Sequence, residues 1–157
     1  MDKMMRICGK SKDGRAIPFT LDNDGAVVVR REWETLNTMV FASYVTKTGS
    51  FKSTTFDCSD WGFVSLRIQN NGLEDAPTVK FNIYSDRSGA NDGSYLKDIN
   101  GNNIEFIVPP KSVLIITPED LPALNYMQYL TLKVKLADDS LPDDAQVYIN
   151  VNVISKR

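Results

Sequence analysis

The sequence predicts an all-β protein, an antiparallel β-sandwich of the jelly-roll or immunoglobulin-like (Ig-like) kind preceded by an N-terminal β-hairpin arm. Three observations predict it. Apolar and polar residues alternate with a period of two in several segments after residue 38, as in strands that bury one face. Clusters of Gly, Pro, Asn and Asp separate these segments at the spacing of a sandwich. No segment has the periodicity of a long helix.

The arm is assigned to residues 1–37. Two strand candidates, residues 15–20 and 26–30, flank the sequence Leu-Asp-Asn-Asp-Gly, which is typical of a hairpin turn. Pro18 cannot donate a backbone hydrogen bond within a sheet, so it places the first candidate at an edge. An edge strand with a free side can pair with another chain. We therefore expect the arm to attach the protein to a partner.

The residues expected to contact this partner lie in or beside the two strand candidates. They are Arg15, Ile17, Pro18, Phe19, Leu21, Val27, Val29 and Arg31. Residues 31–37 have mixed spacing, which predicts a single helical turn or an irregular connection. The boundary between the arm and the sandwich domain, residues 38–157, is placed at the end of this connection.

The sandwich domain is expected to contain about eight strands. The segments that alternate or are apolar are residues 39–45, 51–56, 63–69, 79–84, 104–108, 113–117, 129–136 and 147–153. The residues expected to face outward in the fourth and seventh segments are Lys80, Asn82, Tyr84, Thr131, Lys133 and Lys135. Residues 118–122 are expected to open an irregular piece with a single turn of helix. The polar stretch 85–103 is the longest expected loop and the most exposed place for function.

Composition argues against several kinds of partner. The chain of 157 residues has a net charge of −2 and no long basic run, so we expect no nucleic-acid partner. It has no apolar run of about 20 residues, so we expect no membrane partner. Residues 1–6 lack the apolar core of a secretory signal, so we expect synthesis in a cytoplasm.

No catalytic group is predicted, and we expect a protein that is not an enzyme and needs no cofactor. Histidine is absent, which removes the commonest general base and the commonest nitrogen ligand for metals. Cys8 and Cys58 are expected to be free thiols, with Cys58 semi-buried at a strand end. The sequence motifs of a serine nucleophile elbow and of a phosphate-binding loop do not occur.

Metal sites are not predicted either. Residues 22–25 resemble the start of a calcium loop, but the twelfth positions counted from Asp22 and Asp24 are Trp33 and Thr35, which cannot supply the required carboxylate. A hairpin turn is therefore favoured there. Four further carboxylates are concentrated in one short segment, where a solvated turn is favoured over a calcium site: Asp138, Asp139, Asp143 and Asp144.

A carbohydrate site is the alternative that the aromatic residues leave open. Tyr95 lies within the polar stretch 85–103 and is expected to be the exposed aromatic residue, suited to stacking on a sugar. Together with Asp92 it marks the candidate ligand loop. This alternative would make the protein a carbohydrate-binding module.

The arm resembles a pattern found near the start of many structural proteins of tailed bacteriophages. The matching residues are Gly9, Asp13, Gly14, Ile17, Pro18, Leu21, Asp22, Asp24, Gly25, Val27, Val28 and Val29. Residues 55–57 and 64–68 resemble the later part of such proteins in outline. The resemblance implies a virion component made in the cytoplasm of a bacterial host. Among virion components, the resemblance implies a capsid decoration (cement) protein, a homo-oligomer bound to the major capsid protein. A neck, tail or fibre attachment protein is the alternative.

Overall fold

The structure is a computed structural model that describes residues 34–49, 51–85 and 94–157, together with the backbone of four short strands in the first 28 residues. The chain forms two compact units, Met1–Trp33 and Glu34–Arg157. Among the described residues, no helix is long and apolar enough to cross a membrane.

The first unit contains two separate two-stranded antiparallel sheets. Its strands are β1 (Cys8–Lys10), β2 (Ala16–Pro18), β3 (Thr20–Leu21) and β4 (Val27–Val28). Strand β1 pairs with β2, and β3 pairs with β4. The predicted hairpin corresponds to β3 and β4. The first strand candidate is divided between the two sheets, because residues 16–18 pair with a strand, β1, that the sequence pattern did not indicate.

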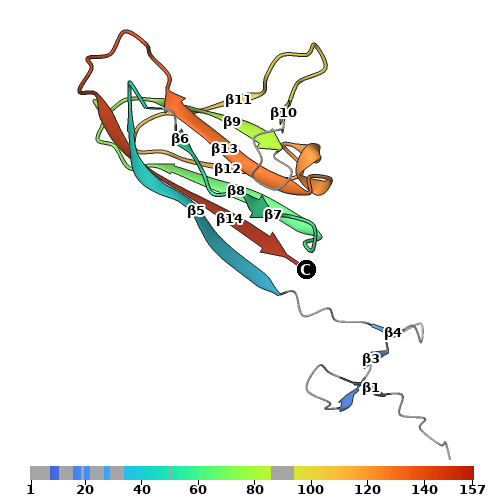
Figure 1. Ribbon diagram of the computed structural model, residues 1–157. Helices are drawn as coiled ribbons and strands as arrows, with labels where there is room; N and C mark the ends of the chain where they lie inside the picture. Colours follow the sequence, from blue (N-terminus) through green and yellow to red (C-terminus); the bar gives the residue numbers. More distant parts are fainter. Residues whose placement is uncertain are drawn as a thin grey trace, which may run out of the picture. The chain divides into compact units, whose positions relative to one another are not determined.

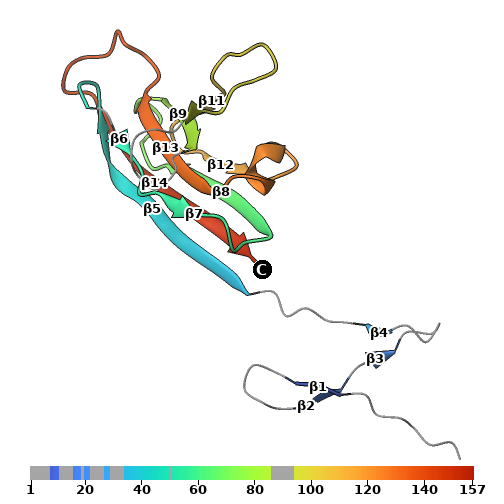
Figure 2. The ribbon, with the colours of Figure 1, turned by 45° about the vertical axis from the view of Figure 1, so that its right-hand side comes forward.

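The second unit is a sandwich of two antiparallel sheets (Figures 1 and 2). One sheet has the order β12–β8–β14–β5. The other is built on β9 and β13, with β10 and β11 beside β9 and with β6 and β7 beside β13. The strands are β5 (Thr35–Thr46), β6 (Phe51–Lys52), β7 (Phe56–Asp57), β8 (Phe63–Asn70), β9 (Val79–Ser85), β10 (Ser94–Tyr95), β11 (Glu105–Val108), β12 (Val113–Ile116), β13 (Tyr129–Leu136) and β14 (Gln146–Lys156).

The order of pairing distinguishes the two predicted kinds of sandwich. If β6 and β7 are counted as one interrupted strand, the first strand pairs with the last, the second with the second last, and so on inward: β5 with β14, β6/β7 with β13, β8 with β12, and β9 with β11. This nested pairing is that of a long hairpin rolled into two sheets. The predicted all-β sandwich is confirmed, and its topology is that of a jelly roll.

The core lies between the two sheets and follows the predicted alternation. Its fully buried side chains include Leu66, Phe81, Leu132 and Ile149. Two residues expected on the wet face are buried as well, Tyr84 and Thr131, because neighbours on the outer face cover them. The Thr131 hydroxyl, for example, lies 2.9 Å from the Thr55 hydroxyl.

The jelly roll begins before residue 38, where the sequence analysis placed the boundary. Strand β5 starts at Thr35, in a segment expected to be a helical turn or an irregular connection. The physical reason is tertiary: β14 continues to Lys156 and supplies backbone partners for residues 35–37. Glu34 and Arg157 extend the pairing by two backbone hydrogen bonds, of 3.0 and 3.1 Å.

Two smaller predictions also changed in detail. The predicted strand 51–56 is interrupted, with irregular backbone at residues 53–55 between β6 and β7. The predicted helical turn is a 3₁₀ helix, η1 (Pro122–Asn125), which begins at the last residue of the 118–122 segment and buries Leu124.

Candidate functional site

The predicted attachment residues fall partly within the described strands. Ile17 and Pro18 belong to β2, Leu21 to β3 and Val27 to β4. Leu21 and Val27 are brought directly opposite each other by the pairing of β3 with β4. The other four predicted contacts lie outside the described residues: Arg15, Phe19, Val29 and Arg31.

The two small sheets of the first unit each leave backbone edges unpaired within the part of the chain that the structure describes. Each strand has a partner on one side only. The strands are two or three residues long, and a lone two-stranded hairpin is marginally stable in water. Unpaired N–H and C=O groups along an edge can pair with a strand of another chain. These edges are the candidate attachment site.

The long edge strand of the jelly roll, β5, also has one unpaired side, but that edge is interrupted and cannot pair with another chain along its whole length. Its 12 residues include no charged residue and no proline, a composition that leaves an edge open to pairing with other chains. However, its register with β14 shifts by one residue next to Val40. The backbone N–H and the hydroxyl of Thr54 both donate to the Val40 carbonyl, at 2.9 and 3.1 Å. The bulge and this contact interrupt the edge at its middle.

The candidate ligand loop is only partly described. Asp92 lies outside the described residues, whereas Tyr95 is in β10, opposite Tyr84 of β9. The Tyr95 ring is half-buried, meets the Tyr84 ring edge to face at 5.3 Å and lies under the Lys133 ammonium. The expectation that Tyr95 is the exposed aromatic residue is therefore wrong. Tyr126, after η1, is 86 % exposed.

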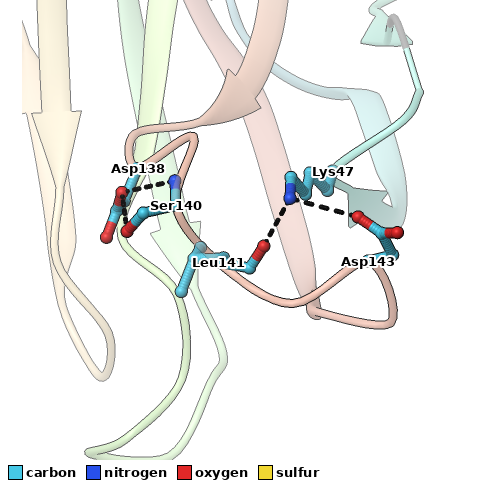
Figure 3. A network of polar contacts seen from close by, with 5 residues as sticks. All are labelled: Lys47, Asp138, Ser140, Leu141 and Asp143. Carbon is cyan, nitrogen blue, oxygen red and sulfur yellow. Dashed lines mark hydrogen bonds and ion pairs between the residues drawn. The ribbon is translucent and has the colours of Figure 1, made fainter.

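The acidic segment between β13 and β14 is an ordered turn (Figure 3). Asp138 accepts hydrogen bonds from the backbone and hydroxyl of Ser140, at 2.8 and 2.7 Å, and these bonds lower the pKa of its carboxyl group. Lys47, after β5, donates to the Leu141 carbonyl at 2.6 Å and pairs with Asp143 at 3.1 Å. Asp138 and Asp143 thus serve separate contacts. Within the described ranges, no group of three or more His, Cys, Asp or Glu side chains is arranged to hold a metal ion.

The one cysteine whose side chain is described is chemically quiet. Cys58 follows β7, is 4 % exposed and is a free thiol. Burial, and to a lesser degree the neighbouring Asp57 carboxylate, raises its pKa to about 12. The thiolate is the nucleophilic form of cysteine, so Cys58 stays protonated and unreactive near neutral pH.

A cluster of lysines on the outer face of the β9–β13 sheet was not predicted from the sequence. Lys133 and Lys135 were predicted to face outward, but each segment was considered by itself. The pairing of strands brings Lys52 opposite Lys133 and Lys80 opposite Lys135. The alternation within β13 predicts that its lysines face outward. Only the register between strands places them opposite the lysines of β6 and β9.

No protein-family model matches this chain, and no curated protein matches its sequence. Solved structures with a similar fold include the SPBc2 prophage-derived protein YomS, with a TM-score of 0.44 and 10% identity over 83% of this chain and 99% of that chain. They also include a chain of tomato aspermy virus, with a TM-score of 0.43 and 12% identity over 83% of this chain and 80% of that chain. Both are likenesses of fold alone.

Proposed function

We propose that this protein is a non-enzymatic structural component of a virion, a capsid decoration protein that docks on the major capsid shell through its first unit. The observation that carries the proposal is the incomplete sheets of that unit. Strands β1–β4 form two sheets of two short strands, joined by sequence to a separate jelly roll that has a complete core. Sheets of this size gain stability when a further strand is added to their open edges.

Two further features support the proposal. The segment from Gly9 to Val29 resembles the start of tailed-bacteriophage structural proteins, and it contains β2, β3, β4 and all of β1 except its first residue. The second unit is a jelly roll, an architecture found in viral capsid domains, lectins and cupins. The fold is thus compatible with the role without specifying it.

The proposed attachment is suited to a protein present in many copies. A pairing of two or three residues per strand gives a weak contact by itself. When several copies are linked as a homo-oligomer on a shell, each further contact becomes intramolecular and the whole assembly holds much more tightly than one copy. We therefore expect shell binding to depend strongly on the oligomeric state of this chain.

The proposal is tested by comparing the full chain with residues 34–157 in a co-sedimentation assay on assembled shells. We expect the full chain to sediment with the shells. The shortened chain should remain in the supernatant and still unfold cooperatively, because the buried core cluster lies within the second unit. Equal binding by both chains would overturn the proposed attachment.

A point variant makes the same test without shortening the chain. Val27→Pro removes a backbone N–H and disfavours the pairing of β3 with β4, so we expect weaker shell binding. Tyr126→Ala is the control, because this tyrosine is exposed on the second unit. The control variant should bind shells as the unchanged chain does. Binding confined to isolated necks, tails or fibres would replace the decoration role by the alternative attachment role.

A further inference from the structure

The outer face of the β9–β13 sheet carries a cluster of positive charge. Four lysines from three neighbouring strands project from it: Lys52, Lys80, Lys133 and Lys135. Like charges directly opposite each other destabilise a sheet. Glu105 of β11 offsets one of them, at 3.8 Å from the Lys80 ammonium. Within the residues that the structure describes, neither Lys133 nor Lys135 forms an ion pair.

The Lys133 side chain is held in place by two tyrosine rings. Its ammonium lies 4.3 Å from the centre of the Tyr84 ring and 4.7 Å from that of Tyr95. The two rings also pack edge to face on each other. Cation–π contacts of this kind orient an ammonium without neutralising it. Lys133 is therefore a positioned positive charge that remains available to an anion.

A groove of about 260 Å³ opens beside this charge. Lys133 and Lys135 line it together with Asn82 and Tyr95, and Asp138 and Asp139 lie along it on the turn after β13. The Asn82 amide nitrogen donates to the Ile104 carbonyl at 3.1 Å, which leaves its oxygen as an acceptor. The groove thus combines cationic donors with neutral and anionic acceptors.

The groove recognises its ligand through side chains. The backbones of β9 and β13 are paired with each other beneath it, with Lys133 opposite Asn82. A peptide that binds by adding a strand needs a free backbone edge, which the backbones of Asn82 and Lys133 do not offer because each is paired within the sheet. Bases of a nucleic acid need open aromatic faces for stacking, whereas the Tyr84 and Tyr95 rings already hold the Lys133 ammonium.

We propose that this groove binds a saccharide that carries a carboxylate, such as a segment of a uronic-acid polysaccharide. The carboxylate would be bound by Lys133 and Lys135, and the hydroxyl groups, which both donate and accept hydrogen bonds, would be bound by Asn82, Tyr95 and the aspartates at the rim. A ligand rich in phosphate offers few donors to these acceptors, and its higher negative charge per group is repelled by the aspartates more strongly than that of a carboxylate. The volume is below the roughly 300–1,000 Å³ of pockets that enclose drug-sized ligands, so the groove fits a short segment of such a chain.

The test is calorimetric titration of the full chain with a galacturonic-acid tetrasaccharide. A galactose tetrasaccharide, inorganic phosphate and a hexaglutamate peptide serve as the other probes. We expect the uronate to bind, and its affinity to fall when the salt concentration is raised. The neutral sugar should bind at least about tenfold more weakly, because it lacks one charge-assisted hydrogen bond. Failure to bind the uronate, equal binding of the neutral sugar, or tighter binding of phosphate or peptide would overturn the proposal.

Variants locate the site. Lys133→Gln and Lys135→Gln should each weaken uronate binding about tenfold. Lys111→Gln is the matched control, because this exposed lysine pairs with Glu74 in another part of the molecule. The affinity of this variant for the uronate should be unchanged. Lys135 is exposed, so its variant keeps the test decisive even if Lys133→Gln lowers stability. Unchanged binding by Lys135→Gln would place the saccharide elsewhere. The result is independent of shell attachment, which depends on the first unit.

Discussion

At the scale of single residues, one buried asparagine joins three parts of the jelly roll. Asn70, at the end of β8, is 1 % exposed. Its amide nitrogen donates to the carbonyls of Pro77 and Val108, both at 3.1 Å, and its oxygen accepts from the Gly72 backbone at 3.0 Å. Every polar atom of the side chain is thus used, as buried polar groups require.

Replacement of Asn70 by alanine should therefore be costly. Asn70→Ala leaves two carbonyls and one N–H without their partner, so we expect the free energy of unfolding to fall by about 2–4 kcal/mol. Urea unfolding measures it. Asn71→Ala is the control, since this neighbouring asparagine is exposed and should stay within about 0.5 kcal/mol of the unchanged chain. A similar small loss for both variants would contradict the structural role of Asn70.

At the scale of elements, the interruption between β6 and β7 closes one edge of the sandwich. Ser53 is bound to β13, because its N–H donates to the Leu132 carbonyl and its hydroxyl accepts from the Leu132 N–H, each at 2.9 Å. The next residue, Thr54, is bound to Val40 in the other sheet. A short irregular segment thus joins the edges of both sheets, and together with the bulge at Val40 it protects β5 from pairing with other chains.

This arrangement predicts a specific cost for losing one hydroxyl. Ser53→Ala leaves the buried Leu132 N–H without an acceptor, so we expect a loss of about 1–3 kcal/mol in the free energy of unfolding. Denaturant unfolding of the variant is the measurement. Ser43→Ala, at an exposed position on β5, should change stability by no more than about 0.5 kcal/mol. If Ser53→Ala were as stable as this control, the edge closure would not depend on the hydroxyl.

Element by element, the sequence predicted what depends on local pattern. Leu130, Leu132, Val134 and Leu136 alternate cleanly, and all four are buried in β13. The burial of Thr131 was missed, because it depends on Thr55 from a different segment. In the same way, the start of β5 depends on the length of β14, and the lysine cluster depends on the register between strands. Such features are decided by pairing over long sequence distances, which the pattern within one segment does not contain.

At the scale of the whole molecule, the chain enters the jelly roll beside its last residue. Glu34 and Arg157 exchange two backbone hydrogen bonds, and their side chains form an ion pair of 2.7 Å. The hydrogen bond and the charge of Glu34 raise the pKa of Arg157. This clasp fixes the first residue of the second unit. The candidate attachment strands precede it, and the saccharide groove lies on the β9–β13 sheet, so the two proposed contacts belong to different units.

The most direct test of the account is hydrogen–deuterium exchange of the full chain, free and bound to assembled shells. The central claim is that the sheet edges of residues 8–28 are completed by a foreign surface. We expect the amides of β1–β4 to exchange rapidly in the free protein, as short two-stranded sheets do, and to become protected on the shell. The amides of β8, β13 and β14 should be protected in both states. Equal exchange of residues 8–28 in the free and bound protein would contradict the claim.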